Sequence, residues 1–284
     1  MIKVGFNVLA WSADISEDLY PIIERLKNIG YDGVEFFVGS DKLSAYAPLG
    51  RHAKELGLEV TTVTVVSPEA NPVSDSAEVR QKGLDRIKWS IDRSQELGSK
   101  VLCGPFHSAH AHFYGRPGTA EELKRAAETL YAAGEYAQQA GLVLTPEALN
   151  RFECYLLNTM EQLSALLSEV NHPNVKGMFD THHANIEEKS YQEALKTIGS
   201  MLHHVHISEN DRGTPGGGHI PFDAAFEGLK AIDYSGWLTI EAFSRNDPAF
   251  ANAINVWRQY DDPWDIAERG YEFIKNRCQK FNLS

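Results

Sequence analysis

Cysteine, positive charge and long apolar runs are all scarce in this chain of 284 residues. Its three cysteines, Cys103, Cys154 and Cys278, are too few and too scattered for a disulfide framework or a cysteine-rich zinc site. The formal charge of −12 argues against nucleic acid or an anionic membrane surface as the main partner. No apolar run reaches the roughly 18 residues of a membrane span, and the N-terminus has no pattern of a secretory signal. We therefore expect a reduced, cytoplasmic protein.

Short apolar runs alternate with longer segments of helical periodicity along the whole chain. The expected strands are residues 3–9, 33–37, 59–66, 100–104, 142–147, 175–180, 202–207 and 236–241. The expected helices are residues 18–29, 47–56, 77–97, 120–140, 159–170, 191–198, 222–231 and 264–279. Strict alternation predicts an α/β protein with a parallel sheet, and eight units predict closure into a (β/α)8 TIM barrel. No linker divides the chain, so we expect one domain over residues 1–284.

Four segments that follow expected strands are long: residues 67–76, 105–119, 208–221 and 242–263. The catalytic face of a TIM barrel is built from such loops, at the C-terminal ends of the strands. Two of these loops carry histidines or aromatic residues, among them His110, Phe243 and Trp257. They are expected either to wall a pocket or to form a dimer contact.

Four expected strands end on a side chain that can bind a divalent cation. The runs VLTPE, VKGMFD, HHVHIS and WLTIE place Glu147, Asp180, His206 and Glu241 there. Because the C-terminal ends of barrel strands meet at one rim, these four side chains predict a single metal site at that face.

Each of the four also suits an ordinary structural role when it is taken alone. Glu147 suits an exposed strand end, Asp180 suits a cap on the following turn, and Glu241 suits a cap or a salt bridge. By the two-residue period of a strand, His204 and His206 lie on the same face. We assign His206 as the ligand because it is nearer the C-terminal end, and His204 as interior packing.

Three carboxylates and one imidazole suit Mn²⁺, Co²⁺ or Mg²⁺ better than a structural zinc ion. We expect one divalent ion, with Mn²⁺ preferred. Four protein ligands leave room in an octahedral shell for two substrate oxygens, which is the arrangement needed to chelate an α-hydroxy ketone. Such an ion would polarise the carbonyl and stabilise the enediolate formed when the neighbouring carbon loses its proton.

These segments also carry a family resemblance. PEALNRFE, MFDTHHANIEE, HVHISENDRG and GWLTIEAF resemble the xylose isomerase-like barrel family, and within it the D-tagatose and D-allulose (psicose) 3-epimerases. The resemblance extends over essentially the whole chain. It implies an isomerase in which Glu147 and Glu241 are both metal ligands and the acid/base pair. One removes the C3 proton of a free keto-sugar, and the other returns a proton to the opposite face of the enediolate.

The resemblance also implies the residues that bind the substrate and the state of assembly. Glu153, His183 and Arg212 would bind sugar oxygens around O1–O3, and the protein would be a homodimer or homotetramer. Two alternatives stay open from the residues themselves. Glu153 and Arg212 would also suit a surface ion pair, and His182 would also suit the inward position instead of His183.

Other functions share the same first chemical step. An aldose–ketose isomerase of the hydroxypyruvate, erythrulose or inosose type, or a lyase on a 3-keto sugar, would use the same metal site. A non-catalytic sugar-binding barrel is a further alternative, whereas too few histidines and the acidic charge disfavour a multi-metal endonuclease. The segment GTPGGG (213–218) lacks the pattern of a phosphate-binding loop. A lid or a tight loop is expected there, and a free sugar is favoured over a sugar phosphate.

Overall fold

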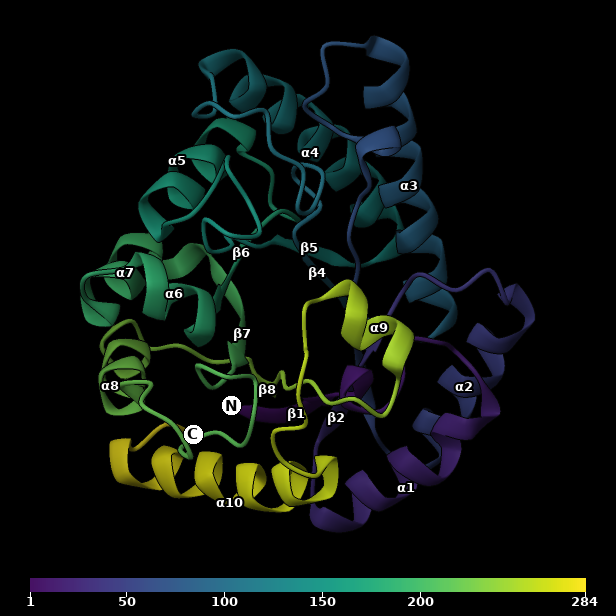
Figure 1. The fold of residues 1–284 in the computed structure, drawn as a ribbon, viewed down its shortest axis with the longest axis vertical. Coiled ribbons are helices and arrows are strands. Elements are labelled where there is room, and N and C mark those ends of the chain that lie inside the picture. The colour runs from purple at the N-terminus through teal and green to yellow at the C-terminus, as the bar shows by residue number, and fades with distance from the viewer.

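Eight parallel strands form a ring at the centre of the molecule, with the helices outside it (Figure 1). The computed structural model describes residues 1–284. The strands are β1 Lys3–Asn7, β2 Gly33–Phe37, β3 Glu59–Val63, β4 Val101–Gly104, β5 Val143–Pro146, β6 Gly177–Asp180, β7 Leu202–Ile207 and β8 Trp237–Ile240. They pair in the order β5-β4-β3-β2-β1-β8-β7-β6. Parallel bridges between Leu144 and Val175 and between Glu147 and Met178 join β5 to β6. The chain is therefore a single-domain (β/α)8 barrel, as predicted.

The helices confirm the expected alternation and add two short ones. They are α1 Tyr20–Ile29, α2 Leu43–Glu55, α3 Ala77–Glu96, α4 Ala120–Ala140, α5 Met160–Val170, α6 Thr181–Glu187, α7 Tyr191–Ile198, α8 Phe222–Ala231, α9 Pro248–Ala253 and α10 Pro263–Phe281. The expected bounds of β2, β7, α4, α7 and α8 agree with the structure. The sequence did not predict α6 and α9, which lie in the loops after β6 and β8. None of these helices has the length and apolarity needed to cross a membrane.

The ends of β1 and β3 fall earlier than predicted. Val8–Ala10 forms a 3-10 turn because the Asn7 side chain accepts a hydrogen bond from the Leu9 N–H at 2.9 Å. Apolar composition alone does not reveal such a cap. The strand β3 ends at Val63, before the long loop that leads to α3.

The inner and outer faces of the strands differ in polarity. Outward residues such as Phe6, Val34 and Phe36 are fully buried in the apolar core between strands and helices. The inside of the barrel instead holds polar side chains, among them Asn7 and Glu35, which are also fully buried. Because burial of a polar group is costly unless it is hydrogen-bonded, this interior must form a connected network.

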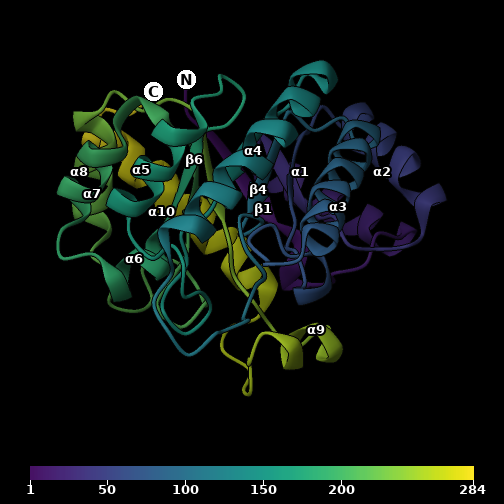
Figure 2. The same cartoon turned by 90° about the horizontal axis from the view of Figure 1, so that it is seen from above.

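The N-terminal end of the barrel is filled by the Trp237 ring. A Cβ atom on Gly33 would lie 2.5 Å from this ring, so glycine is required at the start of β2. The opposite end carries the loops after the strands, and Figure 2 shows α9 projecting on the side away from the N-terminus. The C-terminal ends of the strands are therefore the open end, where the predicted ligands lie.

Candidate active site

The structure brings the four predicted metal ligands together at the C-terminal rim of the barrel. Glu147 follows β5, Asp180 ends β6, His206 lies near the end of β7 and Glu241 follows β8. Ligand atoms of Glu147, Asp180 and His206 lie within 4.8 Å of one another. Glu241 Oε1 lies 3.4 Å from His206 Nδ1. All four side chains are buried, so their proximity is not a chance grouping of surface charges.

Hydrogen bonding determines the orientation of the His206 ring. Its Nε2 lies 2.8 Å from Glu35 Oε1 and donates to that carboxylate. The proton therefore resides on Nε2, and the Nδ1 lone pair faces Glu241 Oε1 at 3.4 Å and Asp180 Oδ2 at 3.6 Å. Nδ1 has no hydrogen-bond partner although it is buried. A neutral imidazole with one nitrogen held by a carboxylate and the other free is the form that ligates a metal.

Asp180 serves two structural purposes at once. Its Oδ1 caps α6 by accepting hydrogen bonds from the N–H groups of His182 and His183, at 2.6 and 3.3 Å. Its Oδ2 faces the site and accepts from Ser208 Oγ at 3.0 Å. The capping and metal-site interpretations of this residue are therefore compatible, since each uses a different oxygen.

Arg212 lies inside the site and does not form a surface ion pair with Glu153. Its Nη1 donates to Glu241 Oε2 at 2.9 Å and to Asp180 Oδ2 at 3.1 Å. Its Nη2 lies 3.1 Å from His183 Nε2. The backbone of Arg212 is left-handed, with φ of 64°, and its carbonyl accepts the Phe243 N–H at 3.0 Å. A non-glycine residue in this conformation is uncommon, and here it directs a buried guanidinium at two carboxylates.

Of the two neighbouring histidines, His183 approaches Glu147, although ligand atoms of both lie within 4.8 Å of one in Glu153. His183 Nε2 lies 3.6 Å from Glu147 Oε1, and the side chain is almost fully buried. His182 turns its Nδ1 toward the Glu209 carbonyl at 3.1 Å, although it also lines the cavity. Between the two histidines, the inward position therefore belongs to His183.

Glu153 lies at the outer edge of the same group. Its Oε1 accepts from Asn150 Nδ2 at 2.8 Å, and its Oε2 lies 3.4 Å from His110 Nε2. Burial alone would raise the pKa of Glu153, but His110, His183 and Arg212 hold it well below its usual range. The side chain therefore presents a carboxylate to the cavity.

The pKa values of the four proposed ligands reflect their burial beside one another in the centre of the site. Burial, and then the charge of Glu241, raise the pKa of Glu147 well above its ordinary value. Burial alone would raise the pKa of Asp180 too, but Arg212 holds it well below. Burial opposes protonation of His206, yet Glu241 and Glu35 raise its pKa well above normal. The carboxylates around His206 thus attract positive charge to its ring, and a divalent cation held by the same donor set would take the place of the proton.

A second observation supports this fit. The buried Glu147 Oε1 has no hydrogen-bond partner, like His206 Nδ1. Buried polar atoms without partners are rare in folded proteins, and many of those that occur coordinate an ion or a water molecule. The residues present therefore match a site for one divalent metal ion at the rim of the barrel.

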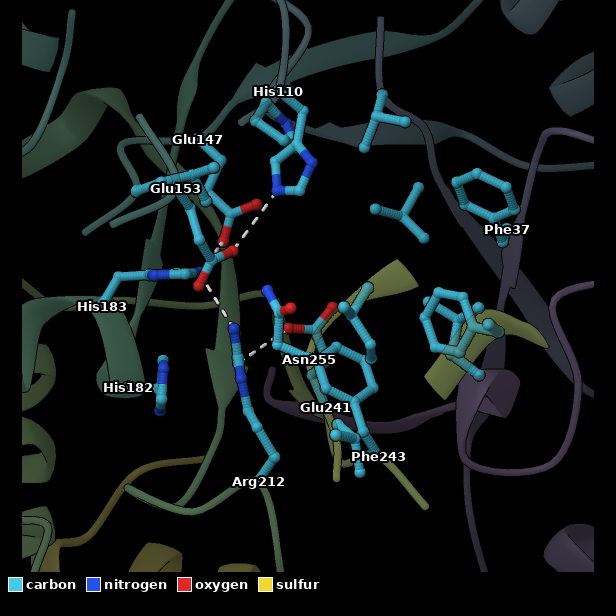
Figure 3. Close-up of a pocket in the computed structure, with 18 of the residues that line it drawn as sticks. Phe37, His110, Glu147, Glu153, His182, His183, Arg212, Glu241, Phe243 and Asn255 are labelled. Carbon is cyan, nitrogen blue, oxygen red and sulfur yellow. Dashed lines mark hydrogen bonds and ion pairs between the residues drawn. The ribbon is translucent and has the colours of Figure 1, made fainter. Parts of the chain in front are cut away.

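The cavity beside these groups has a polar and an apolar half (Figure 3). Its volume is about 250 Å³, which suits a ligand smaller than the drug-sized molecules of most pockets. The polar lining residues are His110, Glu147, Glu153, His182, His183, Asn210, Asp211, Arg212, Glu241 and Asn255. The apolar half includes Leu9, Phe37, Val63, Val65, Phe243, Phe250, Ile254, Val256 and Tyr260. Of the loop residues named from the sequence, His110 and Phe243 thus line the cavity, whereas Trp257 is exposed.

Comparison with known proteins agrees with this arrangement. The family model described as xylose isomerase-like TIM barrel matches residues 23–277. The chain belongs to the xylose isomerase-like TIM barrel family.

Relatives within this family have sugar epimerase activities. The chain is 31% identical to a D-psicose 3-epimerase of Agrobacterium fabrum, over 94% of each chain. It is similar, with a TM-score of 0.91 and 30% identity, to the crystal structure of a D-allulose 3-epimerase from Methylomonas sp. in complex with D-allulose, over 97% of each chain. It is also 30% identical to a 3-dehydro-D-guloside 4-epimerase of Escherichia coli, over 88% of this chain and 96% of that one. The predicted resemblance to ketose 3-epimerases is confirmed.

Two residues support the site in ways that the sequence did not indicate: Glu35 was missed, and His107 was expected only to wall a pocket or to form a dimer contact. Glu35 lies within the apolar run GVEFF, and His107 follows β4. His107 Nε2 donates to the Glu147 carbonyl at 2.8 Å, and burial lowers the pKa of His107 to about 4, so it is a neutral donor. The signal for Glu35 was a charged residue at the centre of an expected buried strand. His107 had no comparable signal, because its partner is a backbone atom.

The segment GTPGGG forms a tight loop around a carboxylate of its own chain. Glu209 Oε2 accepts the Gly216 N–H at 2.8 Å, and Oε1 accepts the N–H groups of Asn210 and Ile220, both at 3.0 Å. Backbone N–H groups that converge in this way commonly bind an anion. Here Glu209 occupies that position, so the loop holds no place for a phosphate group.

Proposed function

We propose that this protein is a divalent-metal-dependent ketose 3-epimerase that acts on free keto-sugars. The observation that carries the proposal is the convergence of Glu147 and Glu241, from β5 and β8, beside the donor atoms of Asp180 and His206. Inversion at a carbon next to a carbonyl needs two acid/base groups, one for each face of the planar intermediate. The similarity to the D-psicose 3-epimerase supports the choice of C3.

Glu147 and Glu241 would share proton transfer at C3. One carboxylate takes the C3 proton, which leaves an enediolate over C2 and C3. The other carboxylic acid then gives a proton to the opposite face of C3, so the proton count is unchanged and the configuration is inverted.

Glu147, Asp180, His206 and Glu241 would hold one divalent ion, with Mn²⁺ preferred and Co²⁺ or Mg²⁺ as alternatives. When bound, such an ion supplies positive charge that stabilises the negative charge developing on the substrate oxygens. Oxygen-rich ligand sets with one imidazole accept any of these three ions, so availability also affects which one is bound.

Glu153, His183 and Arg212 would bind the sugar oxygens O1–O3. Arg212 supplies donors that reach two carboxylates and a histidine, and a sugar hydroxyl can join that network. The opposite wall, which includes Phe37 and Phe250, is mostly apolar, so few hydrogen-bonding side chains, among them Asn255 and Tyr260, remain for the far end of the sugar. The Glu209-filled loop favours a free sugar over a phosphorylated one.

A second candidate function is epimerisation at C4 of a 3-keto sugar. The 30% identity to the 3-dehydro-D-guloside 4-epimerase favours this alternative over the aldose–ketose isomerase or lyase. The same two carboxylates would act, because C4 is also adjacent to the carbonyl in a 3-keto sugar. Such a substrate carries its carbonyl at C3, and its C1 substituent would face one wall of the cavity.

The proposal includes a homodimer or homotetramer and a reduced, cytoplasmic setting. Phe113 and Phe152, from the loops after β4 and β5, are exposed aromatic residues on the face that carries the site. Exposed aromatics on one face suit burial against a second copy. All three cysteines are free and buried, which suits a reducing compartment.

Product analysis tests the choice between the two epimerase reactions. Manganese-loaded protein is incubated separately with D-fructose, D-tagatose, L-ribulose and a 3-keto glucoside, and the products are separated by chromatography. The proposal predicts that at least one ketose yields its C3 epimer and that the glycoside is unchanged. Conversion of the glycoside alone would establish the second candidate, and formation of an aldose would establish an isomerase.

A further inference from the structure

Glu35 is a fully buried carboxylate inside the barrel, next to the proposed metal ligands. Its polar neighbours come from β1, β3, β4 and β7, and they are Asn7, Thr61, Cys103, His204 and His206. A carboxylate without exposure to water is stable only when its oxygens are well satisfied. Glu35 has no place in the proton transfer or in substrate binding, so its burial must serve another purpose.

The two oxygens of Glu35 contact different sets of residues. Oε1 lies 2.8 Å from His206 Nε2 and 3.0 Å from Asn7 Nδ2. The same Asn7 Nδ2 also donates to Glu241 Oε1 at 3.3 Å. Oε1 is thus joined to two of the four proposed ligands, one directly and one through a single amide.

The partners of the other oxygen are not among the four proposed ligands. Oε2 accepts from Thr61 Oγ1 at 2.9 Å and from Cys103 Sγ at 3.3 Å, and His204 Nε2 lies 2.9 Å away. Neither Thr61 nor His204 is hydrogen-bonded to any of the four proposed ligands. Substitution of Thr61 therefore provides a matched control, since its hydrogen bond is also buried and reaches the same carboxylate.

We propose that Glu35 is a positioning residue that prepares the metal site by holding His206 directly and Glu241 through Asn7. This inference rests on the metal site of the proposed function. The Glu35 carboxylate keeps the His206 proton on Nε2, fixes the ring plane and makes Nδ1 a better electron-pair donor. Loss of a carboxylate behind a metal-binding histidine typically weakens metal affinity by about 10- to 100-fold.

A second metal ion at Glu35 is the competing interpretation. Ligand atoms of Glu35, Cys103, His204 and His206 lie within 4.8 Å of one another. The direct hydrogen bond between His206 and Glu35 at 2.8 Å, however, already uses the nitrogen that such an ion would need. The Cys103 thiol likewise retains its proton to donate to Glu35. A hydrogen-bonded support accounts for the contacts of His206 and Cys103 without a second ion, whereas both buried His204 nitrogens have no hydrogen-bond partner, so the number of ions bound per chain decides between the two interpretations.

Titration calorimetry of metal-free protein with Mn²⁺ tests the proposal, with Glu35→Gln as the test variant and Thr61→Val as the control. Glu35→Gln keeps the shape of the side chain and removes its charge. The expected result is one ion per chain, an affinity at least tenfold weaker in Glu35→Gln, and an affinity within threefold of the wild type in Thr61→Val. Weakening of less than tenfold in Glu35→Gln, an equal loss in Thr61→Val, or two ions per wild-type chain would overturn it.

Two further measurements keep the outcome clear. Circular dichroism of the metal-free variants shows whether each one folds. If Glu35→Gln does not fold, Glu35→Asp replaces it under the same tenfold criterion, because aspartate keeps the charge but withdraws the oxygens from His206. Failure of the wild-type protein to bind Mn²⁺ would instead remove the metal site, and with it the proposed function.

Discussion

The Arg212 guanidinium lies 2.9 Å from Glu241 and 3.1 Å from Asp180, so one cation joins two of the proposed metal ligands. It also lies 3.1 Å from His183 and 4.9 Å from the centre of the Phe243 ring. This arrangement connects the loop after β7 with the strand ends of β6 and β8. Arg212 thereby links Glu241, a proposed acid/base group, to His183, a proposed sugar-binding residue.

Replacement of Arg212 by lysine tests that link. An ammonium group reaches one carboxylate but lacks the planar fork that contacts Asp180, Glu241 and His183 together. We expect Arg212→Lys to lower kcat/KM by at least about tenfold, the scale of a lost charged hydrogen bond. Steady-state kinetics checks this, with Arg151→Lys as the control because Arg151 pairs with Glu187 at the exposed rim. Equal kinetics in Arg212→Lys and wild type would contradict the assigned role.

Glu147→Gln and Glu241→Gln test the acid/base pair. Each amide keeps the shape of the side chain but cannot exchange a proton with C3. We expect kcat to fall by about 10²–10⁴-fold in each variant, the typical size for loss of a positioned acid or base. Glu227→Gln provides a control for the loss of a charge elsewhere, because Glu227 is exposed. Turnover within threefold of wild type in either test variant would remove that residue from the mechanism.

Removal of the metal should abolish activity and lower stability together. A chelator is expected to leave no turnover, and Mn²⁺ or Co²⁺ should restore it. Because the ion binds only the folded chain, Mn²⁺ at 100 times its Kd should add about 2.7 kcal/mol to the free energy of unfolding. Activity assays and thermal unfolding of the same samples measure both effects. Full turnover in a preparation shown to be metal-free would contradict the proposed site.

The Glu122 carboxylate, which lies outside the proposed metal site, should make the stability of the folded protein sensitive to acid. Burial alone would raise its pKa, but hydrogen bonds from Arg116, Tyr155 and Thr119 lower the pKa of Glu122 to about 2. Since the folded-state pKa lies below the ordinary value, this stability is present above about pH 4.5 and is lost as the pH falls toward 2. The free energy of unfolding of Glu122→Gln should therefore be lower by up to about 3 kcal/mol at neutral pH. It should also fall less steeply than that of the wild type as the pH is lowered.

Urea unfolding between pH 7 and pH 3 measures this effect. Glu121→Gln is the control, because Glu121 lies in the same first turn of α4 but is exposed. The two variants should differ at pH 7 and converge as Glu122 is protonated in the wild type. Parallel curves for both variants would show that the hydrogen bonds to Glu122 contribute nothing specific.

The barrel and its ligand positions could be predicted because both follow local patterns. Alternation of strand and helix signals gives the eight units, and a polar side chain at the end of an apolar strand marks the rim. His206 and His204 illustrate this well, since the two-residue period places both on one face and the distance from the strand end separates them. The structure places His206 at the rim beside Asp180 and Glu241, and His204 in the interior against Glu35.

The supporting network could not be predicted, because its contacts join residues far apart in the chain. Glu35 and His206 are separated by 171 positions, and no local signal pairs them. The short helices α6 and α9 were missed for a related reason. They depend on caps from Asp180 and Asp247, and a carboxylate in a sequence suits either a cap or a metal ligand. In the structure Asp180 caps α6 with one oxygen and turns the other toward the proposed metal site.

Proton exchange at C3 tests the central claim most directly. Manganese-loaded protein is incubated in D₂O with D-fructose, D-allulose, D-tagatose, ribulose and xylulose, and each carbon position is followed by NMR. We expect deuterium at C3 together with the appearance of the C3 epimer for at least one of these ketoses. Deuterium at C1 or C2 with an aldose product, or no exchange at C3 in any of them, would contradict a ketose 3-epimerase.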